Sequence, residues 1–240
     1  INGEIISADS MQIYKYMDIG TAKPKKEEMM GIKHYLIDEI TPFESFSVNE
    51  FVIRAKKYID EIRSRGKIPI IAGGTGLYIS TLTDNVKFTE SETDISLREE
   101  LMKDAKLKGN EYIHNMLQEI DPESAERIHP NNLKRVIRAI EIFKTSGITM
   151  SEQIANSKKE PSPYELSYFA LTAPREYLYE RINKRVDMML SEGLVDEVKA
   201  LKEMGLDKTY NSMQGIGYKQ TLDYLEGKMS LSELAELIKQ

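Results

Sequence analysis

The chain has 240 residues, of which 40% are hydrophobic and 30% charged, and it carries no Cys. This length allows one large domain or two modest ones with a real core, and the absence of Cys excludes disulfide scaffolds and Cys-ligated zinc. The 33 Lys and Arg against 39 Asp and Glu give a net charge of −6, so the total charge by itself does not point to a polyanion partner. The sequence has no apolar run of about 18 residues, so it predicts no membrane span.

The N-terminal third predicts a parallel sheet. Residues 4–8 have the pattern of a short buried strand, residues 33–40 of another, and the apolar run 68–72 suits the centre of a parallel sheet. A glycine turn at 73–76 follows, and a helix is expected from Leu77. Strands that alternate with helices in this way indicate an α/β fold.

The clearest helix is expected over residues 47–65. Ser47 and Glu50 have the spacing of a capping box, and Gly66 supplies a stop signal. Between them, apolar residues recur with the helical period.

From about Thr93 the pattern becomes helical, and a strand returns only at 168–171, after a linker at 157–163. We therefore expect an α/β core over 1–92 and 165–240, interrupted by an all-helical insertion over 93–164. Helices are expected at 95–107, 110–119, 122–128, 132–146, 175–191, 194–204, 216–226 and 230–239.

Asp9 and Ser10 directly follow the first predicted strand, and open α/β sheets place ligands at the carboxyl ends of their strands. A carboxylate there can act as a base or hold a metal through water. The alternative is that Asp9 or Ser10 caps the next segment.

The glycine turn at 73–76 is a second candidate site. Glycines let backbone amides approach a ligand, and a following helix N-terminus favours an anion; the alternative is a simple strand-to-helix turn. A Walker A motif is absent, because neither Gly66-Lys67 nor Gly227-Lys228 is followed by Ser or Thr or preceded by Gly at the required spacing.

The helix expected from Asn132 has an apolar face and a basic one. Residues 127–144 carry a net charge of +4, whereas residues 111–126 carry −5. The basic face suits phosphate contacts, and the alternative is a solvated helix surface. Arg181 and Arg185, four residues apart, could face one ligand or pair with neighbouring acids. The three His residues have no metal-ligand spacing.

Four stretches together resemble the tRNA dimethylallyltransferase family, also called tRNA isopentenyltransferase. They are Gly3–Pro24, Ala72–Tyr78, Arg127–Glu141 and Gln214–Lys219, and they occur in the family's order over essentially the whole chain. The resemblance implies a P-loop-NTPase-like parallel sheet with an all-helical insertion that contacts tRNA. It also implies transfer of a dimethylallyl group from its diphosphate to N6 of the adenosine next to the anticodon (position 37), assisted by Mg²⁺.

The resemblance assigns roles to individual residues. Asp9 matches the general base, and Thr75 matches a substrate-contacting position that we group with it as catalytic. Arg185 and, as the second choice, Arg181 are the candidates for the diphosphate contact, between which the motif does not decide, and no metal ligand is assigned. The residues that match tRNA contacts are Asp9, Ser10, Met11, Gln12, Thr75, Arg98, Lys134, Arg135, Arg138, Gln214, Gly217 and Lys219.

One departure concerns the ends of the chain. The family carries a P-loop before the strand that ends at Asp9 and a basic tRNA-contacting segment beyond Gln240, and the sequence begins with Ile1 rather than Met. We therefore expect a core truncated at both ends, from a longer or processed protein, that is inactive by itself.

Three other functions compete. A prenyltransferase of free adenine nucleotides would share Asp9 but would not need the basic insertion. A small-molecule P-loop kinase would need a Walker Lys. An acidic helical interaction module would not depend on Asp9. We expect the transferase: a cytoplasmic monomer whose partners are a tRNA anticodon stem-loop and dimethylallyl diphosphate, with no membrane association.

Overall fold

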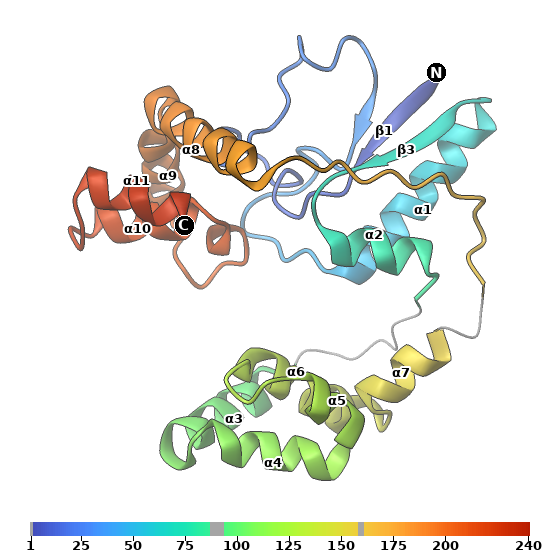
Figure 1. Cartoon of the computed structure of the whole chain (residues 1–240), viewed down its shortest axis with the longest axis vertical. Helices are drawn as coiled ribbons and strands as arrows, with labels where there is room; N and C mark the ends of the chain where they lie inside the picture. Colours follow the sequence, from blue (N-terminus) through green and yellow to red (C-terminus); the bar gives the residue numbers. More distant parts are fainter. Residues whose placement is uncertain (1, 87–93, 158–160) are drawn as a thin grey trace. The chain divides into compact units, whose positions relative to one another are not determined.

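The computed structural model describes residues 2–86, 94–157 and 161–240. The chain forms two compact units, one of Ile1–Ile79 with Ser167–Gln240 and the other of Ser80–Leu166 (Figure 1). The boundary expected between residues 92 and 93 lies outside the described residues, as does the 158–160 part of the expected linker.

The first unit contains a parallel sheet of β1 (Gly3–Ser7), β2 (His34–Tyr35) and β3 (Ile68–Ala72), in the order β2-β1-β3. The prediction that residues 68–72 form a central strand is wrong for the described part of the chain, where β1 is central. β3 is at the edge of this sheet, and Ile68 and Ile70, which share one face of it, are 55% and 37% exposed. An apolar run alone does not distinguish a central strand from an edge strand.

Helix α1 (Val48–Ser64) packs beside β1 and β3 (Figure 1). The predicted capping box is confirmed: Ser47 Oγ accepts from the Glu50 amide at 3.2 Å, and Glu50 Oε2 accepts from the Ser47 amide at 2.7 Å. Gly66 follows the helix with a φ of +68°, a conformation that glycine adopts without strain. The buried face consists of Phe51, Val52, Ala55, Ile59 and Ile62.

The buried carboxylate of Glu4 links the end of α1 to the three strands. Glu4 on β1 accepts hydrogen bonds from Lys67 at 2.7 Å, Arg65 at 2.6 Å and Tyr35 Oη at 2.8 Å. These contacts lower the pKa of Glu4 from 4.5 to about 2, and the hydrogen bond from Lys67 makes the largest contribution. A charge removed from water in this way needs such partners.

The strand predicted at 168–171 is wrong. Residues 165–174 have no regular structure, and Tyr168, Phe169 and Leu171 are 70%, 87% and 100% exposed. No strand among the described residues pairs with them. A strand requires a partner for its backbone groups, so local β propensity does not suffice here.

The C-terminal helices of the first unit form a bundle. All of their ends agree with the sequence prediction within two residues, and the largest difference is at α10, which starts two residues later than expected, directly after Gly217 with its φ of +92°. The elements are α8 (Arg175–Glu192), α9 (Leu194–Glu203), the 3₁₀ turn η1 (Ser212–Gln214), α10 (Tyr218–Leu225) and α11 (Leu231–Lys239).

The regular elements in the described part of the second unit are all helices, and its core includes Leu101, Ile113, Leu117 and Ile140. Helix α7 was not predicted from the sequence. The α/β class, with a parallel sheet and many helices, is confirmed. The helices are α3 (Ile95–Lys108), α4 (Asn110–Ile120), α5 (Pro122–Arg127), α6 (Leu133–Ser146) and α7 (Met150–Ser157), and α2 (Gly76–Thr83) crosses the division between the units.

Candidate active site

The carboxyl ends of β1 and β3 are held together by backbone hydrogen bonds. The Ala8 amide donates to Ala72 O at 2.8 Å, and the Thr75 amide donates to Ala8 O at 3.0 Å. Gly73 makes this approach possible, because a Cβ at that position would lie 2.4 Å from the Ala8 carbonyl carbon. The first glycine of the turn is therefore required by packing between strands.

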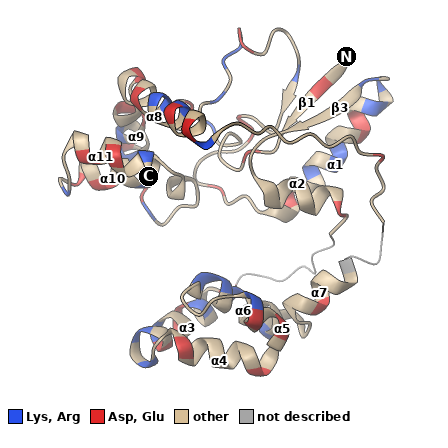
Figure 2. Ribbon diagram, viewed as in Figure 1, with Lys and Arg blue, Asp and Glu red and all other residues tan. Residues whose placement is uncertain are grey.

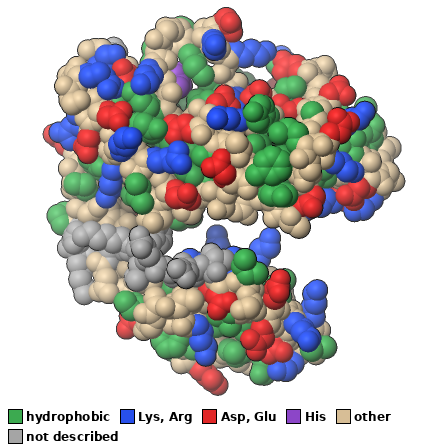
Figure 3. Space-filling model, turned by 180° about the vertical axis from the view of Figure 1, so that it is seen from behind, with side chains coloured by type: hydrophobic (Ala, Val, Ile, Leu, Met, Phe, Trp, Pro, Cys, Tyr) green, Lys and Arg blue, Asp and Glu red, His purple; other side chains and the backbone are tan. Residues whose placement is uncertain are grey.

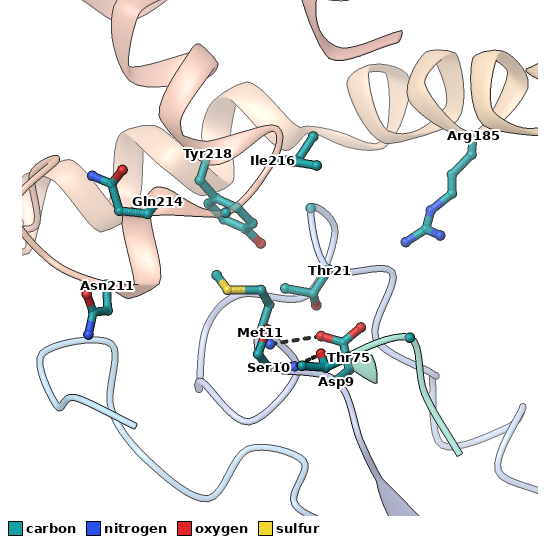
Figure 4. A pocket seen from close by; sticks show the side chains of 13 residues that line it. Asp9, Ser10, Met11, Thr21, Thr75, Arg185, Asn211, Gln214, Ile216 and Tyr218 are labelled. Atoms are coloured by element: carbon teal, nitrogen blue, oxygen red, sulfur yellow. Dashed lines mark hydrogen bonds between the residues drawn. The ribbon is translucent and has the colours of Figure 1, made fainter. Parts of the chain in front are cut away.

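Asp9 begins a tight turn just beyond β1. Its Oδ1 accepts from the amides of Met11 at 2.8 Å and Gln12 at 3.2 Å. The Ser10 amide donates to Thr75 Oγ1 at 3.0 Å, and Figure 4 marks the contacts of Ser10 and Met11 with dashed lines. The two roles considered for Asp9 from the sequence are therefore compatible. Its Oδ1 caps the turn, and the carboxylate also lines a pocket.

This pocket has a volume of about 540 Å³ and lies within the first unit (Figure 4). One wall comes from the ends of β1 and β3, and the other from α8, η1 and α10. Arg185 directs its guanidinium from α8 into the pocket. The predicted site residues that line the pocket are Asp9, Ser10, Met11, Thr75, Arg185 and Gln214.

Four predicted residues of the first unit do not line this pocket. Gln12 is a structural tie: its Oε1 accepts from Ser7 Oγ at 3.1 Å, and its Nε2 donates to the Thr21 carbonyl at 3.3 Å. Arg181 lies over the Tyr177 ring, 5.7 Å from its centroid. Gly217 is buried at the start of α10, and Lys219 is exposed on that helix.

Sequence reasoning missed Tyr218, which forms part of the helical wall. The residue is buried, and its hydroxyl donates to Glu197 Oε1 at 2.6 Å. Burial raises the pKa of Tyr218, and the Glu197 carboxylate raises it further, so the hydroxyl remains a proton donor. The only available signal was its position inside the motif Gln214–Lys219.

Two glycines bring the walls close together. A Cβ on Gly20 would lie 2.5 Å from the Tyr218 ring, and a Cβ on Gly215 would lie 2.7 Å from Met11 Cε. Both glycines line the pocket. The loop after β1 therefore packs directly against η1 and α10.

The basic residues of the second unit that are predicted to contact tRNA are of two kinds. Lys134 and Arg135 are exposed on α6, along which basic residues gather in Figure 2. Arg98 and Arg138 instead bind Glu141. Arg98 makes two contacts of 2.8 Å with that carboxylate, and Arg138 makes one of 2.5 Å.

Glu141 is 0% exposed, and it was counted from the sequence only as a charge on the basic helix. Its Oε1 also accepts from the Asp94 amide at 2.9 Å, just before α3. Burial raises the pKa of Glu141, but the hydrogen bonds from Arg98 and Arg138 outweigh it and leave the pKa below its usual value. This carboxylate is therefore charged and links α3 to α6.

The described residues contain no cluster of three or more His, Cys, Asp or Glu side chains that could hold a metal. On the face drawn in Figure 3, acidic and basic side chains intermingle over the first unit. None of the described helices is long and apolar enough to cross a membrane.

Comparison with known proteins gives a consistent result. The family model described as IPP transferase matches residues 12–240. A tRNA dimethylallyltransferase of Acetivibrio thermocellus is 59% identical over 239 residues, which cover 100% of this chain and 76% of that protein.

Solved structures agree. The full-length tRNA isopentenylpyrophosphate transferase of Bacillus halodurans matches with a TM-score of 0.69 and 45% identity, over 99% of this chain and 74% of that one. A eukaryotic dimethylallyltransferase described as acting on tRNA matches with a TM-score of 0.74 and 31% identity, over 99% of this chain and 60% of that one.

Proposed function

Because the chain belongs to the IPP transferase family, we propose that the protein transfers a dimethylallyl group from dimethylallyl diphosphate to N6 of the adenosine at position 37 of tRNA. The observation that carries the proposal is the pocket in which Asp9, Thr75 and Arg185 meet. A carboxylate, a hydroxyl and a guanidinium match the needs of an amine nucleophile and a diphosphate leaving group.

In this proposal Asp9 is the general base. As N6 attacks the allylic carbon, a carbon–nitrogen bond forms and the carbon–oxygen bond to diphosphate breaks. The electron pair of that bond leaves with diphosphate, and the N6 proton passes to the Asp9 carboxylate. The hydrogen bonds from Met11 and Gln12 to Oδ1 fix this carboxylate, so that Oδ2 is directed to the substrate.

Arg185 would neutralise the diphosphate. Its guanidinium points into the pocket, and planar guanidinium groups bind phosphate oxygens through two hydrogen bonds at once. Arg181 would assist from one helical turn away.

The pocket also suits Mg²⁺, which prefers oxygen ligands and is commonly bound by one or two carboxylates together with substrate phosphates. Asp9 would hold the ion through a water molecule, so that its carboxylate remains available as the base, and Ser10 and Thr75 would supply hydroxyl oxygens along the lining. When bound, Mg²⁺ would supply positive charge to the departing diphosphate.

We further propose that tRNA contacts several surfaces. In the first unit these are Ser10, Met11, Gln214 and, around them, Gln12, Gly217 and Lys219. In the second unit they are the exposed Lys134 and Arg135, together with Arg98 and Arg138, of which the latter two are part-exposed beside Glu141. The positive charge of the Lys and Arg side chains suits contact with the phosphate backbone of tRNA. The target base must leave its stack to reach the pocket.

Transfer measured by mass spectrometry tests this function. The encoded protein that contains this chain is mixed with dimethylallyl diphosphate and an anticodon stem-loop carrying adenosine or guanosine at position 37. We expect modification of the adenosine form only, with AMP a poor competitor. Modification of AMP in preference to the stem-loop would favour the prenyltransferase of free nucleotides instead.

As a tRNA-modifying enzyme, the protein would work in the cytoplasm, and we propose that it does so as a monomer.

A further inference from the structure

One carboxylate in the first unit accepts four hydrogen bonds. Glu197 Oε2 accepts from the amides of Asp18 and Ile19, both at 2.8 Å. Its Oε1 accepts from the Gly20 amide at 3.1 Å and from Tyr218 Oη at 2.6 Å. Each carboxylate oxygen thus has two donors, which is the full capacity of the group.

These contacts join the two walls of the pocket. Gly20 belongs to the loop that follows β1, Glu197 lies in the first turn of α9, and Tyr218 begins α10. Gly20 and Tyr218 both line the pocket, whereas Glu197 does not. The distance between the sheet side and the helical side therefore depends on a side chain outside the pocket.

The packing of Gly20 makes the arrangement sensitive to small shifts. A Cβ on Gly20 would lie only 2.5 Å from the Tyr218 ring, so the loop backbone is in direct contact with that ring. Release of the three amides would let the loop move away from α10 and would widen the site. Active-site geometry tolerates little of this, since a displacement of about 1 Å can cost about 100-fold in rate.

We propose that Glu197 is a positioning residue that holds the loop 18–20 against Tyr218 and so fixes the pocket for tRNA and the prenyl diphosphate. The inference rests on the proposed function for its substrates. It assigns to Glu197 no contact with either substrate.

The variant Glu197→Gln is the sharpest test, because Gln has the same size. Its amide group presents two N–H donors to atoms that are themselves donors. The Tyr218 hydroxyl can rotate to accept, but the backbone amides of Asp18, Ile19 and Gly20 cannot. Glu203→Gln is the matched control, because Glu203 is exposed on the same helix.

Two readouts separate positioning from a loss of folding. The first is amide hydrogen exchange at residues 18–20 in the protein without substrates. We expect it to accelerate by roughly tenfold in Glu197→Gln, which corresponds to one lost hydrogen bond, and to be unchanged in Glu203→Gln. The second is steady-state transfer at a temperature at which circular dichroism finds both variants folded.

A purely structural role would lower the amount of active protein, and hence the apparent kcat, without changing KM. The positioning role predicts a higher KM for the stem-loop and a fall in kcat/KM of roughly 10- to 100-fold. Tyr218→Phe, which removes one of the four donors, should give a smaller change in the same direction.

Unchanged exchange at residues 18–20, or an unchanged KM in folded Glu197→Gln, would overturn the inference. A wild-type protein that transfers nothing to the stem-loop would instead contradict the proposed function. In that case the exchange experiment still decides whether Glu197 holds the loop.

Discussion

The backbone amide of Ser10 donates to Oγ1 of Thr75 at 3.0 Å, although 65 residues separate them along the chain. The parallel pairing of β1 with β3 brings their carboxyl ends to one edge, where Asp9 and Thr75 face the same pocket. The side chain of Thr75 thus fixes the turn that presents the Asp9 carboxylate.

Replacement of Thr75 tests this link. Thr75→Val keeps the shape but removes the acceptor of the Ser10 amide, so we expect a loss of about 1 kcal/mol in the free energy of unfolding. Displacement of Asp9 should also lower kcat by at least about tenfold. Thr75→Ser keeps the oxygen and should preserve most of both quantities. If Val and Ser variants behave alike in urea unfolding and transfer assays, the hydrogen bond has no such role.

Replacement of Gly73 and of its neighbour Gly74 by Ala gives a matched comparison of the free energy of unfolding. A Cβ at Gly73 would meet the Ala8 backbone at 2.4 Å, whereas one at Gly74 would meet nothing within 4 Å. We expect Gly73→Ala to destabilise the protein by about 1–3 kcal/mol, because neither backbone can yield easily. Gly74→Ala should change the free energy of unfolding by no more than about 0.5 kcal/mol. Equal effects in chemical denaturation would contradict the close contact between the strand ends.

The ion cluster at Glu4 predicts how stability depends on pH. The pKa of this carboxyl falls from 4.5 to about 2 on folding, so its contribution is fully present above pH 4.5 and is lost as the pH falls toward 2. Urea unfolding at several pH values should therefore give a shallower acid loss for Glu4→Gln than for the wild type. Parallel curves in this window would mean that Glu4 is not held by Lys67, Tyr35 and Arg65.

The basic residues of the second unit should separate into two classes. Lys134→Gln should weaken stem-loop binding, reduce the slope of log affinity against log salt by about 1, and leave stability unchanged. Arg98→Gln should weaken binding and also cost about 2 kcal/mol of stability, because it removes two hydrogen bonds from the buried Glu141. Thermal melts alongside salt titrations distinguish the two. Equal stability of both variants would contradict the role of the Arg98–Glu141 pair.

The sequence predicted the parts of the site that depend on local pattern. Asp9 and Thr75 each follow an apolar segment with the pattern of a strand, and the carboxyl ends of neighbouring strands share an edge in a parallel sheet, so their meeting could be expected. The helix from Val48 was predictable because its capping box is local.

The predictions that were wrong concern contacts between distant segments. Two of them are the central position expected for Ile68–Ala72 and the strand expected at 168–171. Both depend on which segment pairs with which, and a local pattern does not specify this. Glu141 and Glu197 look like ordinary surface charges of helices in the sequence. Their importance comes from donors on other elements, which only the fold brings to them.

The rate of dimethylallyl transfer by Asp9→Asn tests the central claim most directly. Asn retains an oxygen that can accept from the amides of Met11 and Gln12, so the turn should survive while the base is lost. Circular dichroism and stem-loop binding serve as controls for folding and for the site. We predict unchanged folding and a fall in kcat of about 100-fold or more for the adenosine stem-loop. Transfer by the folded Asp9→Asn variant at the wild-type rate would contradict the assignment of Asp9 as the base.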